Sequence, residues 1–125
     1  SIRVDQVVEH LCTCLELAVN DTDAYVRKTA AVCIAKLAYI DPQRLKEQNF
    51  LDKLTKLAAD SNAVVVANAI AALHDISRIM PGCFKVDKGM LRIMLGALDE
   101  CTEWGQVLIL DCITEHVTPK TAHDA

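Results

Sequence analysis

Apolar residues recur along this chain at the spacing of helices rather than strands. One set follows the spacing i, i+4, i+7, i+8 and i+11, which lines one face of a helix: Val26, Ala30, Cys33, Ile34 and Leu37. A second set repeats this spacing 39 residues later: Val65, Ala69, Ala72, Leu73 and Ile76. The pattern predicts amphipathic helices that bury one face against neighbouring helices.

An aspartate marks the same period in three places. Asp21, Asp60 and Asp99 are 39 residues apart, and each stands between the end of one apolar stretch and the start of the next. The positions that correspond at this period are Val26, Val65 and Trp104; Ala30, Ala69 and Leu108; Ile34, Leu73 and Cys112; and Leu15, Leu54 and Ile93. In the third copy Asp111 and Glu115 fall on the apolar stripe. We therefore expect its second helix to be rotated, or its boundary to lie one residue away.

The periodicity predicts two helices in each copy. The first helices are expected at 5–19, 50–59 and 87–98, and the second helices at 23–39, 62–80 and 102–116. Residue types favoured at helix N-caps stand at the starts of several: Asp5, Asp23, Asn62, Asp87 and Thr102. Pro42 and Pro81 predict the ends of the second helices in the first two copies, and Pro42 also predicts a short helix at 43–47.

These elements predict an all-α fold, an α–α superhelix of about three helical hairpin repeats. We treat residues 1–125 as a single helical-repeat fragment, with approximate repeats at 1–41, 42–81 and 82–125. A hairpin of this size buries its apolar face only against neighbouring hairpins. We therefore expect the natural protein to extend past both ends of this sequence.

Composition supports a packed helical protein and argues against several partners. Hydrophobic residues make up 52% of the chain and aromatic residues 4%, so an ordered core has to be built from small and aliphatic side chains. A net charge of −4 with dispersed basic residues argues against nucleic acid as a partner. The sequence contains no apolar run long enough to span a membrane.

The known motifs of catalysis are missing from the sequence. Its four glycines form no phosphate-binding loop, and there is no GxSxG turn. Adjacent carboxylates such as Asp99 and Glu100 are interpreted as solvated groups at a helix end. We therefore expect no enzymatic activity, no cofactor and no metal.

Most of the six cysteines stand within apolar helical patterns, and we interpret them as reduced thiols of a cytosolic protein: Cys12, Cys14, Cys33, Cys83, Cys101 and Cys112. A nucleophilic role would need an adjacent base. The sequence shows no such partner for Cys33, Cys101 or Cys112, so packing in the core or between repeats is the favoured role.

Histidines next to these cysteines do not form a convincing metal site. His10, Cys12 and Cys14 are spaced i, i+2 and i+4, which does not place all three on one helical face, and no CxxC pair supports them. His74 is expected to be partly exposed. The remaining histidines, His116 and His123, are expected in or near a turn without ligand spacing.

Four residues of the second helices are candidates for partner binding: Arg27, Lys28, Trp104 and Gln106. Trp104 is the only tryptophan, and its correspondence with Val65 favours packing between repeats, with Gly105 allowing close approach. The alternative is a partner-binding anchor, because tryptophan is enriched at interface hot spots. Gln106 would then bond across the contact.

An arginine and an aspartate near the turns also suggest a contact between repeats. Arg27 lies six residues after Asp21, and an acid in a turn can pair with an arginine of the next helix. The corresponding positions in the other copies are Val66 and Gly105, so any ladder of such pairs is incomplete.

Several blocks of the sequence carry a family resemblance. The block from Asp21 to Leu37 resembles a HEAT repeat through its Asp, Val-Arg and alanine pattern. With residues 2–5, 60–73 and 100–113, it resembles the beta-adaptin family, the large beta subunits of heterotetrameric clathrin adaptor complexes. The block around Trp104 is the most specific part of this resemblance. Ala24 and Ala63 depart from it, because proline is expected at both positions.

The resemblance implies a HEAT/armadillo-like solenoid within the adaptin trunk. It implies a non-enzymatic scaffold that holds this trunk together in vesicle-mediated protein transport, with a second large, a medium and a small adaptor subunit as partners. Clathrin would bind through regions outside this fragment, and an Arf-family GTPase is an implied regulator of some members. The implied location is cytoplasmic, peripheral on Golgi or endosomal membranes or clathrin-coated pits.

A different helical-repeat scaffold is the alternative. A nuclear-transport receptor or a phosphatase scaffold also fits the 39-residue period. Neither accounts for the block around Trp104.

Overall fold

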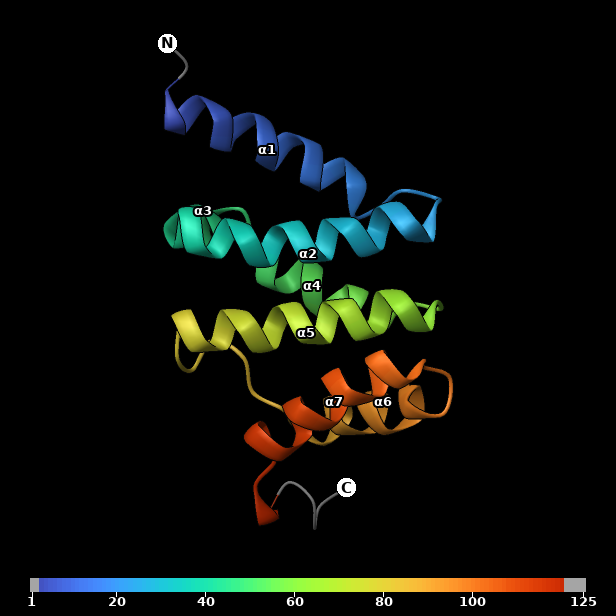
Figure 1. Cartoon of the computed structure of the whole chain (residues 1–125). Coiled ribbons are helices and arrows are strands. Elements are labelled where there is room, and N and C mark those ends of the chain that lie inside the picture. Colours follow the sequence, from blue (N-terminus) through green and yellow to red (C-terminus); the bar gives the residue numbers. More distant parts are fainter. Residues whose placement is uncertain (1–2, 121–125) are drawn as a thin grey trace.

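The computed structural model describes residues 3–120, which form helices and no strand (Figure 1). The helices are α1 (Val4–Ala18), α2 (Ala24–Ile40), α3 (Pro42–Glu47), α4 (Phe50–Leu57), α5 (Ala63–Ile79), α6 (Lys88–Leu98) and α7 (Glu103–His116). Ile2 and His123, which entered the predictions above, lie outside the described residues. The all-helical superhelix predicted from periodicity is confirmed.

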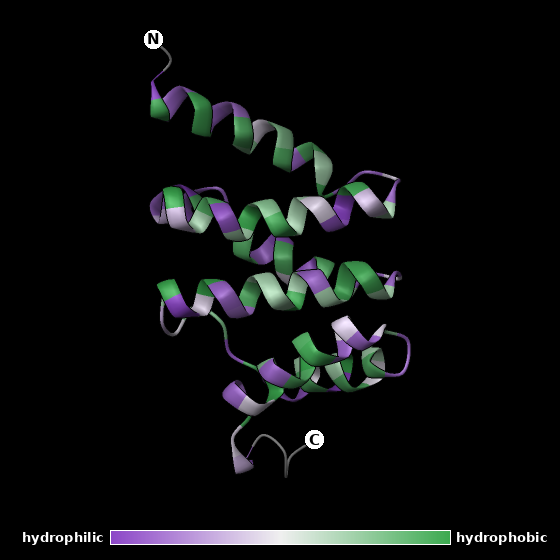
Figure 2. Cartoon of the chain, viewed as in Figure 1, coloured by the Kyte–Doolittle hydropathy of each residue, from purple (hydrophilic) through white to green (hydrophobic). Residues whose placement is uncertain are grey.

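The second helices of the hairpins form a stack in the order α2, α5 and α7. Their N-terminal ends lie on the same side, at the right in Figure 1. Helix α5 is the centre of the structure, because it packs against α2, α4, α6 and α7. Its buried face runs the length of the helix and includes Ile70 and Leu73. Much of its ribbon is accordingly hydrophobic, while the turns leading into α2 and α7 are hydrophilic (Figure 2).

Side-chain caps start most of these helices as the sequence predicts. Asp23 accepts from the N–H of Tyr25 at 2.9 Å, and Asn62 accepts from the N–H of Val64 at 2.9 Å. Asp87 and Thr102 cap α6 and α7 in the same way. These caps satisfy amides that have no partner within the helix.

The predicted cap at Asp5 is wrong. Helix α1 starts one residue earlier, at Val4, with Arg3 at the N-cap position, and Asp5 lies in the first turn. Gln6 Oε1 accepts from the Arg3 N–H at 3.4 Å. An acid in the first turn is still favourable there, because it faces the positive end of the helix dipole.

The prolines act as breaks, as predicted. Helix α2 ends at Ile40, and Asp41 then caps α3 by accepting from the N–H of Arg44 at 3.1 Å. Pro42 is the first residue of α3, where its missing N–H costs nothing. After α5, the chain turns at Gly82, whose φ of 86° is a conformation that glycine adopts without strain.

The third hairpin is displaced by one residue from the 39-residue register. The N-caps Asp23 and Asn62 are 39 residues apart, whereas Asn62 and Thr102 are 40 apart. The buried stripe of α7 therefore begins at Gly105 rather than at Trp104. This confirms the expectation of a shifted boundary, and it changes the partners of every residue in α7.

The same shift applies to the preceding helix. Leu15 and Leu54 are buried as expected, but their structural counterpart is Met94, with no exposed surface, and not Ile93, which is 37% exposed. None of the helices within residues 3–120 has the length and hydropathy needed to cross a membrane.

Candidate partner-binding surface

Three large apolar side chains are exposed at equivalent places on the stacked helices. Tyr25, Val64 and Trp104 each lie two residues after an N-cap, on α2, α5 and α7, and we call these three residues the exposed column. Their exposed fractions are 68%, 47% and 58%. A row of exposed apolar side chains on neighbouring helices is typical of a surface that binds another protein.

The placement of Trp104 overturns the favoured interpretation of this residue. Its side chain is not buried between repeats, because the one-residue shift turns it outward and turns Gly105 inward. A Cβ atom at Gly105 would lie 3.0 Å from the Cβ of Cys101 and 3.3 Å from the Cβ of Ala67. The glycine therefore lets α7 approach α5 closely.

Trp104 and Val64 share a shallow hollow at the start of α5 and α7. Ala63, Ala67 and Cys101 line the same hollow. These side chains are small, so the hollow has an apolar floor beside an exposed indole ring. This combination suits an apolar side chain of a partner, which could insert beside the ring.

Lys28 gives the surface a positive edge. Its ammonium nitrogen lies 4.3 Å from the centre of the Tyr25 ring, within the range of a cation–π interaction. No ion pair in the described part of the chain involves Lys28. Its charge therefore remains available to an acidic group of a partner.

Arg27 is engaged within the chain itself. Its Nε donates to Asp60 Oδ2 at 2.9 Å and its Nη2 donates to Asp60 Oδ1 at 3.1 Å, so the two groups form a bidentate pair. Its Nη1 donates to the carbonyl oxygens of Asp21 and Thr22. The arginine thus ties its own turn to the turn of the next hairpin.

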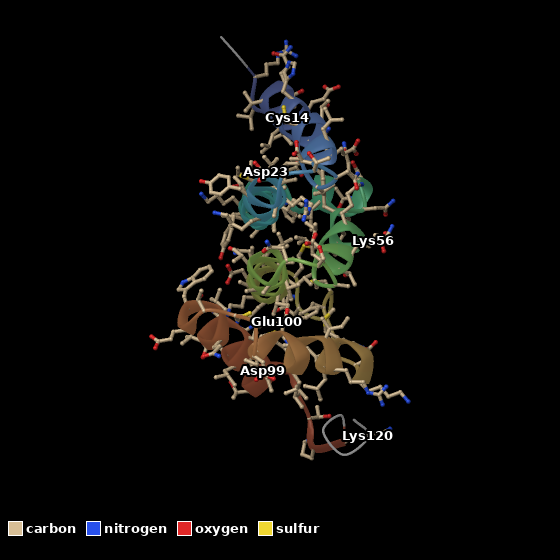
Figure 3. All side chains as sticks on the ribbon, turned by 90° about the vertical axis from the view of Figure 1, so that its right-hand side faces the viewer. Cys14, Asp23, Lys56, Asp99, Glu100 and Lys120 are labelled. Atoms are coloured by element: carbon tan, nitrogen blue, oxygen red, sulfur yellow. The ribbon has the colours of Figure 1, made fainter. Side chains whose placement is uncertain are left out.

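The electrostatics of this pair follow from the contact. The guanidinium of Arg27 lowers the pKa of the Asp60 carboxyl. The hydrogen bond that this carboxyl accepts from the backbone N–H of Asn62 lowers the pKa as well. The acidic turn residues, among them Asp23, Asp99 and Glu100, lie along the end of the stack that faces the viewer in Figure 3. Glu100 stands two residues before its N-cap, as Asp60 does.

Gln106 is the structural counterpart of Arg27. Each lies four residues after an N-cap, and Gln106 Nε2 donates to the carbonyl oxygen of Leu98 at 2.9 Å, which closes the α6–α7 turn. Both side chains therefore hold a turn of the chain itself: Arg27 the turn before α2, and Gln106 the turn before α7. Of the four sequence candidates, Lys28 and Trp104 have side chains that are available to a partner.

The cysteines of the chain are all free thiols. Cys12 is buried in α1 and Cys14 is exposed on the same helix, so these two residues point to different sides. Burial raises the pKa of the Cys112 thiol to about 12, and Glu115 adds to this effect. Such a thiol is a poor nucleophile at neutral pH.

The prediction for His74 is wrong, and that for His116 is right about its place near a turn but wrong about its lack of ligand spacing. His74 is buried, with 7% of its surface exposed, and does not lie partly exposed on the second repeat. His116 is the last residue of α7 and faces inward, where its Nε2 lies 2.9 Å from His74 Nδ1. The signal was present in the sequence, because Cys112 and His116 are spaced i, i+4, but the packing of α7 against α5 is what brings His74 to them.

The comparisons with known proteins agree with this architecture. The family model described as non-SMC mitotic condensation complex subunit 1, Cnd1, matches residues 1–125. The AP-1 complex subunit beta of Dictyostelium discoideum is 48% identical over 125 residues, covering 99% of this chain and 13% of that protein. The human AP-1 complex subunit beta-1 is 47% identical over 138 residues, covering 98% of this chain and 14% of that protein.

A further relative extends the same relationship. The AP-2 complex subunit beta of Schizosaccharomyces pombe is 40% identical over 103 residues, covering 81% of this chain and 15% of that protein. The chain therefore spans about one seventh of the length of the curated relatives it matches.

Stacked helical hairpins without a strand in residues 3–120 define a helical-repeat protein. The chain belongs to the HEAT-like Cnd1 family. Its resemblance to beta-adaptin is confirmed, since the similar proteins named above are beta subunits of AP-1 and AP-2 complexes.

Proposed function

We propose that this chain is part of the beta subunit of a clathrin adaptor complex and acts there as a non-enzymatic scaffold in vesicle-mediated protein transport. The observation that carries this proposal is the 48% identity to an AP-1 beta subunit across 99% of the chain. The structure supports a scaffolding role, because its helices form a continuous stack with a buried core.

The exposed column is the surface that we assign to partner subunits. Tyr25, Val64 and Trp104 offer apolar contact area, and Lys28 adds a positive charge at the edge. The partners would be the second large, the medium and the small subunits of the complex. The scaffold would hold these subunits in fixed positions along the trunk.

The wider assignments rest on the same family relationship. Clathrin would bind through regions outside this chain, and an Arf-family GTPase would regulate recruitment. The complex would place the chain in the cytoplasm, peripheral on Golgi or endosomal membranes or on clathrin-coated pits. Residues 1–125 would form a single unit of about three hairpins within the adaptin trunk.

Affinity purification of the protein from its own cells tests the proposal. Mass spectrometry should identify a second large subunit together with medium and small adaptor subunits. Recovery of a nuclear-transport, phosphatase or chromosome-condensation partner set in their place would contradict the adaptor assignment. The helical-repeat fold would stand in either case.

A pair of variants tests the surface assignment. Trp104→Ala should reduce recovery of partner subunits without changing the helical circular dichroism, because 58% of this side chain is exposed. Leu110→Ala is the matched control, since Leu110 lies on the same helix at 48% exposure but outside the exposed column. Equal recovery with both variants would defeat the assignment of Trp104.

A further inference from the structure

We propose that His74, Cys112 and His116 form a binding site for a zinc ion between the second and third hairpins. One ligand atom from each of these residues lies within 4.8 Å of the others. His74 comes from α5, whereas Cys112 and His116 lie one helical turn apart on α7. A bound ion would therefore join two neighbouring helices of the stack.

The donor set matches zinc chemistry. Imidazole nitrogen and thiolate sulfur are the ligands that Zn²⁺ prefers, and a spacing of i, i+4 places two ligands on one face of a helix. On binding, the thiol of Cys112 would release its proton to solvent and form a sulfur–zinc bond. The fourth position of a tetrahedral site would be filled by water or by the Ser77 hydroxyl, which lies 3.3 Å from His116 Nε2.

The distance between the two ligand nitrogens needs only a small adjustment. His74 Nδ1 and His116 Nε2 lie 2.9 Å apart. Two nitrogens bound to one zinc ion at the usual bond length and tetrahedral angle lie about 3.3 Å apart. The imidazoles would part by a few tenths of an ångström, and the Cys112 sulfur, which lies within 4.8 Å of both nitrogens, would approach them to about 3.5 Å by side-chain rotation.

A carboxylate already lies beside the His74 nitrogen that would not bind the metal. Glu115 Oε2 lies 3.2 Å from His74 Nε2, the nitrogen that faces away from His116. If Nδ1 binds the metal, Nε2–H donates to this carboxylate, which fixes the tautomer and the ring orientation. Arg78 Nη2 lies 3.4 Å from the same carboxylate oxygen and 3.1 Å from His74 Nε2, so its N–H would turn to the carboxylate alone when Nε2 carries the proton.

Packing alone does not explain imidazoles at these positions. In the register of the structure, His116 corresponds to Leu37 and Ile76, which are buried aliphatic residues of the stripe. His116 is only half-buried there, and its Nε2 has His74 Nδ1 and the Ser77 hydroxyl as partners, so the place is built around polar groups. The ring of Phe84 lies edge-on to His116, with centroids 5.4 Å apart, and shields the cluster from one side.

Titration of the full chain with Co²⁺ tests the site, because this ion replaces Zn²⁺ and absorbs light. One equivalent of Co²⁺ should produce the strong visible bands of a tetrahedral site and a thiolate-to-cobalt charge-transfer band. Addition of Zn²⁺ should abolish both signals. A weak octahedral spectrum, or no spectrum, would overturn the proposal and leave a hydrogen-bonded imidazole pair.

Variants assign the signal to these residues. Cys112→Ser should lose the charge-transfer band, and His116→Gln should lose the tetrahedral spectrum. If Cys112→Ser fails to fold by circular dichroism, His116→Gln decides the outcome, since His116 lies at the end of its helix and is only half-buried. Cys14→Ser, which changes an exposed thiol on α1, is the control that should bind like the natural chain.

The carboxylate of Glu115, which contacts His74, gives an independent readout. Glu115→Gln should weaken Zn²⁺ binding about 10–100-fold while keeping the tetrahedral Co²⁺ spectrum. Persistence of the charge-transfer band in Cys112→Ser, or unchanged affinity in both Glu115→Gln and His116→Gln, would show that another group binds the ion and would overturn the site.

Discussion

The carboxylate of Asp60, in the turn before α5, receives two N–H bonds from the guanidinium of Arg27 on α2. The two residues are 33 positions apart and belong to different hairpins. Their side chains keep only 17% and 11% of their surface exposed, and the pair has bidentate geometry. Both features make a charged contact stronger than an ordinary surface ion pair.

Replacing Asp60 should therefore destabilise the stack. In Asp60→Asn the side chain keeps its size but loses its charge, so Arg27 is left without its counter-ion. We expect the melting temperature at neutral pH to fall by a few degrees, measured by circular dichroism. Asp52→Asn is the control: its pair with Lys56 is mostly exposed, and its loss should cost about 0–0.5 kcal/mol.

The same pair predicts a pH dependence. The pKa of Asp60 is lowered in the folded state, so its contribution to stability is fully present above the unfolded value of about 3.9. That contribution should be lost as the pH falls below this value and through the lower folded pKa. Thermal melts across this range should show a shallower loss of stability in Asp60→Asn than in the natural chain; parallel curves would contradict the assignment.

Two glycines of the third hairpin should respond to alanine in opposite ways. Gly105→Ala places a Cβ 3.0 Å from that of Cys101 and 3.3 Å from that of Ala67, so it should cost about 1–3 kcal/mol through overpacking. Gly96 has no neighbouring atom within 4 Å of an added Cβ, and Gly96→Ala should stabilise by about 0.5–1 kcal/mol through helix propensity. Denaturant unfolding measures both; equal effects would mean that α7 does not approach α5 as described.

Trp104 provides a direct optical check of the third hairpin's register. It is the only tryptophan and is 58% exposed, so its fluorescence should be quenched readily by acrylamide and should shift little on unfolding. Trp104→Ala should change the free energy of unfolding by no more than about 0.5 kcal/mol. A blue-shifted, protected emission would instead place the ring between repeats.

The caps offer a fifth prediction. Asn62 accepts from the N–H groups of Val64 and Val65, and Asn62→Ala should cost about 0.5–2 kcal/mol because α5 loses this cap. Asp5→Ala should have a much smaller effect, since Asp5 is not the cap of α1. Chemical denaturation of the two variants compares them, and a larger loss from Asp5→Ala would contradict the assigned start of α1.

Local chemistry made the helices predictable from the sequence. The stripe that contains Ile34 and the stripe that contains Leu73 repeat at helical spacing, and most of these residues are buried as expected. Asp23, Asn62 and Thr102 cap helices because their short polar side chains bond amides a few residues away. Such interactions depend on neighbours in the chain, which the sequence displays directly.

Tertiary packing decided the placement of the candidate site residues. A one-residue change in spacing before α7 rotates that helix by about 100°, which exposes Trp104 and buries Gly105. The periodic pattern alone did not decide between the two registers of α7. The 39-residue register puts Asp111 on the apolar stripe, and the register shifted by one residue leaves Leu110 exposed. The close contact of α7 with α5 selects the register that places a glycine at the crossing.

The sequence by itself therefore determined the helices, most of their caps, the spacing of the first two hairpins and the resemblance to beta-adaptin. The three-dimensional packing alone decided that Arg27 pairs with Asp60, that Gln106 closes a turn, and that His74 meets Cys112 and His116. The physical reason is the range of the forces involved. Caps and amphipathic stripes are set within a few residues, whereas these contacts join residues that only the stacking of hairpins brings together.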